Sequence, residues 1–363
     1  MRYIMAGGGT GGHIIPALNI AKALRKVDEE AEFIFVGTKR GLETSLVPKA
    51  GFQLKLIEAK PWKGFKAVFA LFKGVLKSLS IIKTFKPNAL IGTGGYVSAH
   101  AILAAAMSGV PIFLQEQNSY PGLATRFGSI FARKVFLGFD EAKKYLWRKK
   151  FAIHTGNPIT PMEMSEDKSS CRERFGLSPS LPTVLLTGGS QGSSPLNTMM
   201  RLMIEEVGFP QKCQLLWQCG KRDFEDLRNW LTEREEHVKI LDFIDDMWSA
   251  YRASDLVVCR AGAITLAEIA AAGLPAIIVP YPYAAGNHQS KNAMVFAEKG
   301  AAIVIEQREL TPKILYETID GLLRNKEKLD AMSKAMLEIA KPNASQVIAE
   351  FIYAEIRGDS EEG

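Results

Sequence analysis

Cysteine is scarce in this chain, and its cysteines are not spaced as metal ligands. The four of them, Cys171, Cys213, Cys219 and Cys259, all lie after residue 170, without a Cys-x-x-Cys pair. Zinc-binding cysteines usually come in such pairs, and disulfide frameworks are typical of short secreted chains. We therefore expect neither a metal site nor a disulfide framework, and a reducing cytoplasm fits this composition.

Long apolar runs are missing as well. The glycine run at residues 7–9 ends the first apolar stretch too early for a signal peptide, and no uncharged apolar run of about 18 residues follows. We expect a chain that is neither secreted nor membrane-spanning. With 363 residues, 47% of them hydrophobic, the chain is long enough for two cores, because single cores stop growing at roughly 250–300 residues.

Acidic residues are few in the first part of the chain. Residues 1–155 contain 23 Lys and Arg against 9 Asp and Glu, a net charge of +14, whereas residues 156–363 contain 22 against 30, a net charge of −8. Such an asymmetry indicates that one domain meets an anionic partner. Nucleic acid and an anionic membrane are both candidates on this observation alone.

Short apolar runs that end in glycine turns recur in both halves. RYIMAGGG, ALIGTGG and PTVLLTGGS each read as a buried strand entering a turn, with helical stretches such as PALNIAKALRKV between them. Strands that alternate with helices indicate parallel sheets covered on both faces. We predict an α/β protein of two doubly wound, Rossmann-like domains facing a cleft, residues 1–156 and 157–342, joined near TGNPITP. A terminal helix at about residues 343–358 has a periodicity that allows packing on either domain.

Three glycine turns are candidate phosphate sites. GGGTGGH at residues 7–13, GTGGYVS at 92–98 and GGSQGS at 188–193 each lie between a strand and a helix, where backbone N–H groups can converge on an anion. Any one of them can also be a tight turn without a ligand. The first matches G-x-G-x-x-G, but a dinucleotide site needs an acid at the end of the second strand, and AEFIFVG is followed by Thr38 and Lys39.

Eight motifs occur together in a fixed order along nearly the whole chain. They are GGGTGGH, GTGGYVS, LQEQN (114–118), TGNP, GGSQG, FIDDM (243–247), CRAGAITLAEIAAAGLPAIIVP (259–280) and HQSKNA (288–293). In this combination the chain resembles the bacterial MurG glycosyltransferases. The resemblance implies a GT-B fold and an inverting transfer of N-acetylglucosamine from UDP-N-acetylglucosamine. The implied acceptor is the 4-hydroxyl of the muramoyl sugar of lipid I, undecaprenyl-diphospho-N-acetylmuramoyl-pentapeptide, and the product is lipid II for peptidoglycan biosynthesis.

The same resemblance assigns residues to the two substrates. On the donor side, Glu268 is expected to grip the two ribose hydroxyls, Ile244 to lie at the uracil, and Gln289 and Asn292 to read the sugar hydroxyls. The other expected donor contacts are Thr10, Gly11, Gly12, Asn118, Ser190, Gln191, Gly192, Ala263, Thr265, Leu266 and His288. The expected contacts of the acceptor diphosphate are Gly94, Gly95, Tyr96 and Ser98.

Two residues are candidates for the general base. His13 follows the first glycine turn at the start of a helix, where the helix dipole favours a neutral imidazole. Glu116 is the only acid between Glu58 and Asp140, and it can be the base, a partner of His13, or a residue that orders its loop. His13 can likewise serve only to order the first turn.

One position departs from the family pattern, and one motif is absent. Thr160 stands where many relatives carry an arginine after the Asn-Pro motif, so a phosphate-facing cation is missing there. No Asp-x-Asp motif occurs, and FIDDM places its carboxylates side by side rather than alternating. We expect no cofactor and no essential metal, so that loop N–H groups and helix N-termini stabilise the departing diphosphate.

Residues 61–87 combine aromatic residues with six lysines and no acid. A basic, amphipathic, aromatic-bearing stretch is typical of segments that lie among lipid headgroups, although the same residues can fill a core under a solvated lysine face. With a lipid-linked acceptor implied, we expect peripheral attachment to the cytoplasmic face of the bacterial membrane. The residues expected to contact lipid are Trp62, Phe65, Lys66, Phe69, Phe72 and Lys73.

Two other functional classes compete with the transferase. A dinucleotide-dependent oxidoreductase would bind NAD or FAD rather than UDP, and a catalytically silent lipid-surface protein would bind UDP without turnover. Nucleic acid is not expected as a partner, because residues 59–139 offer only two arginines and no recognisable binding module. Proteins of cell-wall synthesis and division are the partners that the resemblance suggests.

Overall fold

The computed structural model describes residues 1–39, 41–58, 65–160, 166–210, 212–231 and 237–358, and for residues 65–70 the backbone only. The chain divides into two compact units. The first comprises Met1–Pro161 and Lys341–Gly363, and the second comprises Met162–Ala340.

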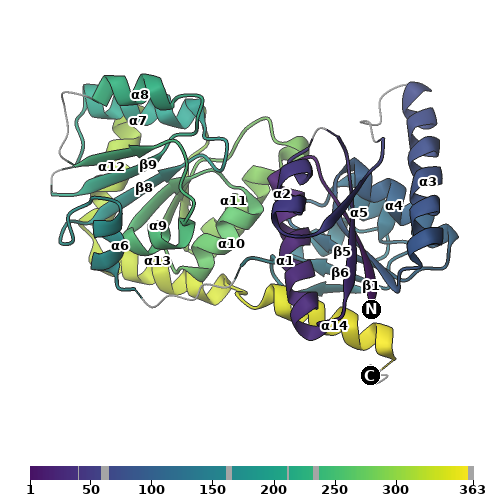
Figure 1. Cartoon of the computed structure of the whole chain (residues 1–363). Coiled ribbons are helices and arrows are strands. Elements are labelled where there is room, and N and C mark those ends of the chain that lie inside the picture. The colour runs from purple at the N-terminus through teal and green to yellow at the C-terminus, as the bar shows by residue number, and fades with distance from the viewer. Residues whose placement is uncertain (40, 59–64, 161–165, 211, 232–236, 359–363) are drawn as a thin grey trace. The chain divides into compact units, whose positions relative to one another are not determined.

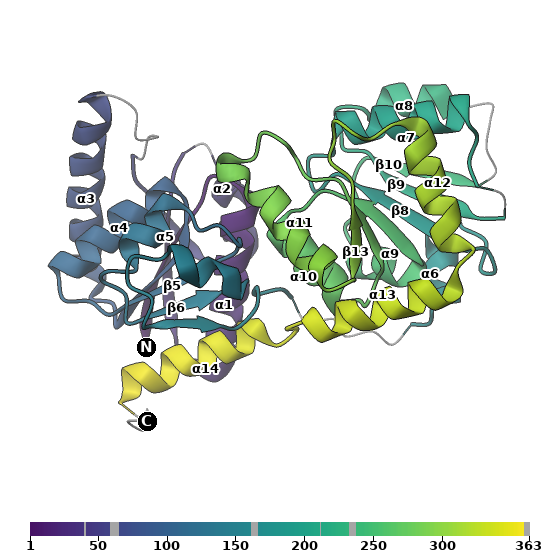
Figure 2. The same ribbon diagram turned by 180° about the vertical axis from the view of Figure 1, so that it is seen from behind.

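Within the described residues, the first unit holds a parallel sheet of seven strands in the order β3-β2-β1-β4-β5-β6-β7. The strands are β1 (Arg2–Gly7), β2 (Glu32–Gly37), β3 (Gln53–Leu56), β4 (Ala89–Gly94), β5 (Ile112–Glu116), β6 (Lys134–Leu137) and β7 (Ala152–His154). The helical segments are α1 (Gly11–Val27), α2 (Glu43–Lys49), α3 (Phe65–Phe85), α4 (Gly95–Met107), α5 (Leu123–Gly128), η1 (Asp140–Tyr145) and α14 (Ala344–Arg357). Figures 1 and 2 show these helices on both faces of the sheet.

The second unit has a parallel sheet of six strands in its described part, in the order β10-β9-β8-β11-β12-β13. The strands are β8 (Thr183–Thr187), β9 (Gln214–Gln218), β10 (Val238–Leu241), β11 (Leu256–Cys259), β12 (Ala276–Ile278) and β13 (Ala302–Val304). The helical segments are α6 (Lys168–Arg174), α7 (Ser194–Glu206), α8 (Phe224–Leu231), α9 (Met247–Ala253), α10 (Ala263–Ala271), η2 (Ala285–Asn287), α11 (His288–Glu298), α12 (Pro312–Leu323) and α13 (Lys326–Ile339).

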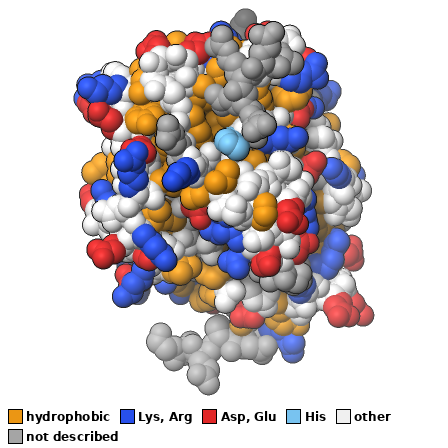
Figure 3. Space-filling view, turned by 90° about the vertical axis from the view of Figure 1, so that its left-hand side faces the viewer, with side chains coloured by type: hydrophobic (Ala, Val, Ile, Leu, Met, Phe, Trp, Pro, Cys, Tyr) orange, Lys and Arg blue, Asp and Glu red, His pale blue; other side chains and the backbone are white. Residues whose placement is uncertain are grey.

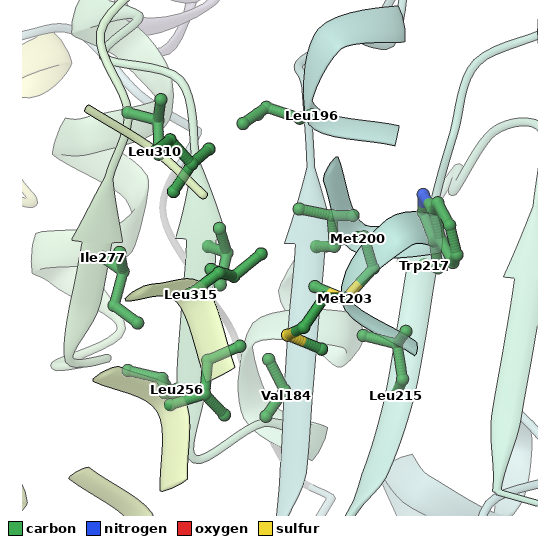
Figure 4. Close-up of a cluster of buried hydrophobic side chains, with 14 of the residues drawn as sticks. Val184, Leu196, Met200, Met203, Leu215, Trp217, Leu256, Ile277, Leu310 and Leu315 are labelled. Carbon is green, nitrogen blue, oxygen red and sulfur yellow. The ribbon is translucent and has the colours of Figure 1, made fainter. Parts of the chain in front are cut away.

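Each sheet is covered by apolar side chains of its helices, as continuous apolar strands require. In the second unit, Met200 and Met203 of α7 and Leu315 of α12 pack on Val184 and Leu215 of the sheet (Figure 4). The first unit has one such cluster on each face of its sheet. These observations confirm the predicted fold class, with two doubly wound α/β units.

The unit boundary lies farther along the chain than the prediction after residue 156. The side chain of Asn157 donates to the carbonyl of Gln117 over 3.0 Å, and the carbonyl of Ile159 accepts a hydrogen bond from the Ser345 hydroxyl over 2.9 Å. These bonds attach the segment after residue 156 to the first unit. The terminal helix α14 also belongs to this unit, since its Ile348 and Ile352 share the cluster of α1.

Each sheet has a topological switch point, where the strand order reverses and ligands of doubly wound folds bind beyond the carboxyl ends. In the first unit it lies between β1 and β4, and in the second between β8 and β11. The glycine turns at residues 7–13, 92–98 and 188–193 follow three of these four strands, β1, β4 and β8. The sequence motifs therefore lie where the fold positions a ligand.

Two further observations concern surface charge and the apolar character of the helices. On the face of the second unit shown in Figure 3, basic and acidic side chains are interspersed. Among the helices of the described residues, none combines the length and apolar character needed to cross a membrane.

Candidate active site

His13 lies where the two switch-point strands of the first unit end. Thr93 at the end of β4 donates its hydroxyl to the His13 carbonyl over 2.9 Å, and Gly94 lies against the ring, so that a Cβ there would approach Nδ1 to 2.8 Å. Gly94 has φ +102°, a backbone conformation that favours glycine. Close approach of the second turn to the histidine thus depends on this glycine.

The partner of the His13 ring is Gln117. Its Oε1 lies 2.9 Å from Nδ1, and its Nε2 donates to the carbonyls of Thr93 at 2.9 Å and Gln115 at 3.2 Å. Because Nε2 faces these acceptors, Oε1 must face the ring, and Nδ1 therefore carries the proton in the neutral histidine. The lone pair is then on Nε2, which is the basic position of the ring.

Glu116 forms no hydrogen bond with His13, so of the three roles open to it the structure does not support that of the histidine's partner. Its carboxylate, 3% exposed, accepts from the backbone N–H groups of Asn118 and Gly122, each at 3.1 Å. Adjacent residues at a strand end point to opposite sides, so Gln117 rather than Glu116 is directed at the ring. The geometry favours the loop-ordering role for Glu116.

The turn expected at the acceptor diphosphate presents its backbone and Tyr96. Gly94 and Gly95 both have positive φ, and Tyr96 is 52% exposed. The Tyr96 carbonyl lies 2.6 Å from Nδ1 of the buried His100, whose pKa is lowered by burial. Ser98 departs from the expectation, because its hydroxyl is buried against Gly92 and does not reach the surface.

The other expected first-unit contacts surround His13. Thr10 and Gly12 are exposed and Gly11 is partly so, while the Asn118 amide lies 3.4 Å from Oε1 of Glu116. Thr160 is bonded to Asn19 over 3.2 Å and supplies no charge. No cation therefore occupies the position of the family arginine.

A residue of the first unit that sequence reasoning missed is Glu43. It is fully buried at the start of α2, and its carboxylate accepts from the N–H groups of Gly9 at 2.9 Å and Thr38 at 2.8 Å. Glu43 lies beyond the end of the second strand, where Thr38 and Lys39 stand and where a dinucleotide site would carry its acid. The sequence signal that could have indicated it is an acid, Glu43, two residues after Gly41 in the segment that follows the second strand.

The second-unit turn is built on a tightly packed backbone. Gly192, with φ +72°, lies against the carbonyl of Cys219, and the Gly189 carbonyl accepts from the Gln218 amide over 2.9 Å. Ser190 and Gln191 are exposed at its tip. The turn leads into α7, a helix of 13 residues whose N-terminal N–H groups can face an anion.

Arg260 places a buried positive charge beneath this turn, and sequence reasoning missed it too. Its guanidinium donates to the Ser193 hydroxyl at 3.0 Å, to the carbonyls of Val279 and Pro280, and to Gln307 at 2.6 Å. Burial lowers its pKa to about 10, so it stays cationic at neutral pH. Within the described residues no carboxylate pairs with it. The positive charge of Arg260 is therefore not neutralised by a described carboxylate, and it lies next to the turn through Ser193.

Glu268 lies on α10, directly after the turn that follows β11. Its Oε2 accepts from the Tyr251 hydroxyl at 3.0 Å, and burial raises its pKa to about 7. Carboxylates with pKa values shifted to neutrality are frequent at ligand sites. Thr265 is partly exposed on the same helix, whereas Ala263 and Leu266 are buried, which leaves their backbone as the part that a ligand can contact.

The remaining donor residues are more enclosed than expected. Ile244 is only 3% exposed and is part of the packing, while its neighbours Phe243 and Asp245 are exposed. Asn292 is fully buried and donates to the Ala261 carbonyl over 3.2 Å, so it supports the turn after β11 instead of presenting its amide. The polar side chains that remain accessible for reading a sugar come from neighbouring positions of α11.

Gln289 and His288 begin α11. Oε1 of Gln289 accepts from the N–H groups of Ala261 at 3.2 Å and Tyr281 at 2.9 Å, which leaves its Nε2 as a donor. His288 orders the loop before the helix, since its Nδ1 lies 2.8 Å from the Ala285 carbonyl. The two bonds of Gln289 hold the segments after β11 and β12 to the start of the helix.

Of the stretch expected to meet lipid, residues 65–85 form α3, on the outer side of α4 (Figures 1 and 2). Phe72 is 62% and Leu76 50% exposed, and Lys73 beside them is exposed as well. Trp62 lies outside the described residues, and the side chains of Phe65, Lys66 and Phe69 do as well. Since α3 follows β3, it begins at the sheet edge that carries the glycine turns.

Both units match known glycosyltransferase domains. Residues 3–137 match the glycosyltransferase family 28 N-terminal domain, and residues 183–349 match the glycosyltransferase family 28 C-terminal domain. The chain is also similar to the curated protein named UDP-N-acetylglucosamine–N-acetylmuramyl-(pentapeptide) pyrophosphoryl-undecaprenol N-acetylglucosamine transferase of Moorella thermoacetica. The two are 40% identical over 97% of this chain and 98% of the relative.

Two more relatives agree with this similarity. The protein of the same name from Acetivibrio thermocellus is 38% identical over 97% of both chains. Among solved structures, Acinetobacter baumannii MurG matches with a TM-score of 0.80 and 29% identity, over 97% of this chain and 99% of that chain.

Proposed function

Since the chain belongs to the MurG family of glycosyltransferases, we propose that it transfers N-acetylglucosamine from UDP-N-acetylglucosamine to the 4-hydroxyl of lipid I, forming lipid II. The proposal rests on the functional side chains that lie near the switch point of each unit. In the first unit, His13 is held with its Nδ1 bonded to Gln117, which leaves Nε2 to accept a proton. In the second unit, Arg260 lies beneath a glycine turn, and α10 carries the Glu268 carboxylate.

In the reaction, Nε2 of His13 takes the proton of the acceptor hydroxyl as that oxygen attacks the anomeric carbon of the donor sugar. The bond from this carbon to the UDP oxygen breaks in the same step, so the configuration inverts without an enzyme-bound sugar. Gln117 retains the Nδ1–H hydrogen bond and thereby stabilises the imidazolium that forms. Thr10, Gly11, Gly12 and Asn118 surround the reacting sugars.

The departing UDP gains one negative charge, because the electron pair of the broken bond to the anomeric carbon stays on its terminal phosphate oxygen, and groups of the second unit stabilise that charge. The turn Ser190–Gly192 and the N-terminal N–H groups of α7 face it, and Arg260 supplies fixed positive charge through its contact with Ser193. Preorganised donors of this kind contribute several kcal/mol, on the order of 3 per donor, in enzymes studied by mutation. We propose that no divalent metal is required.

Donor recognition rests on Glu268 and Gln289. A carboxylate can accept from both ribose hydroxyls, and the Gln289 Nε2 can donate to a sugar hydroxyl. The turn after β11, with Ala263, Thr265 and Leu266, offers backbone groups beside them. The segment around Ile244 would border the uracil through its exposed neighbours.

The first unit would bind the lipid-linked acceptor while it contacts the membrane surface. The glycine turn at residues 94–96 would bind the lipid diphosphate, and α3 would lie among headgroups with its exposed Phe72, Leu76 and Lys73. Its start at the carboxyl edge of the sheet favours an acceptor that reaches the site from a lipid surface. We therefore place the protein peripherally on the cytoplasmic face of the cell membrane, acting with other proteins of cell-wall synthesis and division.

The test measures UDP release by the purified protein from UDP-N-acetylglucosamine, with and without a short-chain lipid I analogue and in the presence of a chelator. Release that requires the acceptor and persists with the chelator supports the transferase and its metal-independent chemistry. UDP binding without release would leave a nucleotide-sugar binding protein, and loss of release on chelation would contradict the metal-free step.

A further inference from the structure

Glu43 is a buried carboxylate that three glycines enclose. A Cβ on Gly8, Gly37 or Gly41 would overlap the Glu43 side chain, so these three segments are shaped around it. Oε2 accepts from the Gly9 N–H at 2.9 Å, while Oε1 accepts from the Thr38 N–H at 2.8 Å and the Thr38 hydroxyl at 2.9 Å. No Lys or Arg of the described part of the chain forms an ion pair with it.

A buried charge without a counterion is retained only where hydrogen bonds satisfy it. Here the three donors come from two loops, one after β1 and one after β2. The carboxylate therefore connects the first glycine turn to the neighbouring strand. Removing it would leave the Gly9 N–H without this acceptor and release the turn on that side.

The connection leads directly to His13. Gly9 has φ +90° and precedes Thr10, whose carbonyl accepts from the N–H groups of His13 and Ile14, each at 3.2 Å. The conformation of the turn thus sets where α1 begins and where its third residue, His13, projects. A shift of the reacting groups by about 1 Å is enough to cost roughly 100-fold in rate.

The position of Glu43 also separates this turn from a dinucleotide site. In dinucleotide-binding domains the glycine turn binds a diphosphate, and an acid after the second strand holds the ribose. Here both oxygens of the acid are used within the protein, and one of them occupies an N–H of the turn itself. The anion that accepts from the Gly9 N–H of this turn is therefore the Glu43 carboxylate of the protein itself.

We propose that Glu43 is a positioning residue of the transferase, which holds the first glycine turn so that His13 is directed at the acceptor hydroxyl. The inference rests on the proposed function. It assigns Glu43 no contact with either substrate, and it predicts an effect on the chemical step rather than on donor binding.

The test compares Glu43→Gln with Thr38→Val. An amide that keeps its oxygen toward the two Thr38 donors must turn its NH2 toward the Gly9 N–H, where donor meets donor. Thr38→Val removes a hydrogen bond to the same carboxylate on the side away from the turn. We expect Glu43→Gln to lower kcat by about 10- to 100-fold with KM for UDP-N-acetylglucosamine within about twofold, and Thr38→Val to change Tm but not kcat.

A further variant keeps the experiment decisive if Glu43→Gln does not fold. Gly8→Ala retains the carboxylate but brings a methyl group to 2.6 Å from its Oε1, so it should lower kcat in the same selective way. Equal kcat in wild type and these variants, or an equal loss in Thr38→Val, would overturn the positioning role. If the wild type itself releases no UDP with acceptor, the proposed function fails instead.

Discussion

The Nδ1 atom of His13 lies 2.9 Å from Oε1 of Gln117, whose own amide nitrogen is bonded to backbone carbonyls at the ends of β4 and β5. The orientation of the histidine ring is thereby set by the ends of two strands of the sheet. An amide in this place fixes the tautomer of the ring without adding charge.

Replacing Gln117 should therefore act through His13. Gln117→Met removes the acceptor of Nδ1–H, and we expect kcat to fall by about 10- to 100-fold with little change in KM for the donor. In a His13→Ala background the same substitution should have almost no further effect on kcat, because the two residues act as a unit. Additive losses in the double variant would show that Gln117 acts elsewhere.

Donor affinity should depend on pH through Glu268. Burial raises its pKa to about 7, and the ionised form is the better acceptor for ribose hydroxyls. Affinity for UDP-N-acetylglucosamine should therefore rise with pH through neutrality, and one pH unit below the pKa it should be weaker by up to about tenfold. Calorimetric titrations between pH 6 and pH 8, on the order of one unit to either side, measure the change.

Glu268→Gln is the matched control, since it keeps the hydrogen bond to Tyr251 but does not titrate. Its affinity should be lower than that of the wild type at high pH and flat across the range. An equally steep dependence in this variant would assign the titration to another group.

Acid stability should depend on Glu43. Burial by itself would raise the pKa of this carboxyl, but hydrogen bonds from Thr38 and Gly9 lower it below its ordinary value of 4.5. A lowered pKa in the folded state means stability that is present above the ordinary value and is lost as pH falls through the folded pKa. The free energy of unfolding of the wild type should thus fall more steeply than that of Glu43→Gln below pH 4.5. Parallel curves in denaturant titrations would contradict this.

Membrane attachment should depend on one face of α3. Phe72 and Leu76 are four residues apart, so they lie on the same side of the helix, and both are at least half exposed. Changing both to Ser should weaken binding to anionic vesicles by about tenfold or more, since each buried apolar side chain contributes roughly 1.5–3 kcal/mol. UDP release with a short-chain acceptor in solution should be unchanged.

Met107→Ser serves as the control for this surface. Met107 is 70% exposed, but it ends α4 at the opposite edge of the sheet. It should leave vesicle binding as it is. Equal losses from both changes in sedimentation assays would indicate nonspecific apolar adsorption rather than a membrane-binding face.

The sequence allowed the fold to be predicted because β1, β4 and β8 are apolar strands that each lead into a glycine turn. It did not allow the roles of Glu116 and Gln117 to be separated. Which of two adjacent polar residues faces a histidine 104 positions away depends on how the strand leaves the sheet. The unit boundary was predicted too early for a similar reason, since the side chain of Asn157 attaches its segment to the first unit.

Glu43 and Arg260 were missed for a different reason. Both are buried charged residues that form a hydrogen bond with a glycine turn elsewhere in the sequence. Glu43 is 34 residues from Gly9 and Arg260 is 67 residues from Ser193, so neither contact leaves a local sequence pattern. Ser98 and Asn292 show the opposite error. Both are motif positions that were expected to contact a substrate, but both side chains are buried beneath turns that were expected to bind one. The resemblance located the site, and the contacts distinguish the residues that form its surface from those beneath it.

The role of His13 in sugar transfer can be measured by following labelled N-acetylglucosamine from UDP-N-acetylglucosamine into a lipid I analogue, with wild type and His13→Ala compared at equal thermal stability. We expect a β-linked disaccharide product from the α-linked donor, formed with chelator present, and a rate of formation at least about 100-fold lower in the variant. Full transfer by His13→Ala, or a product with retained configuration, would contradict it.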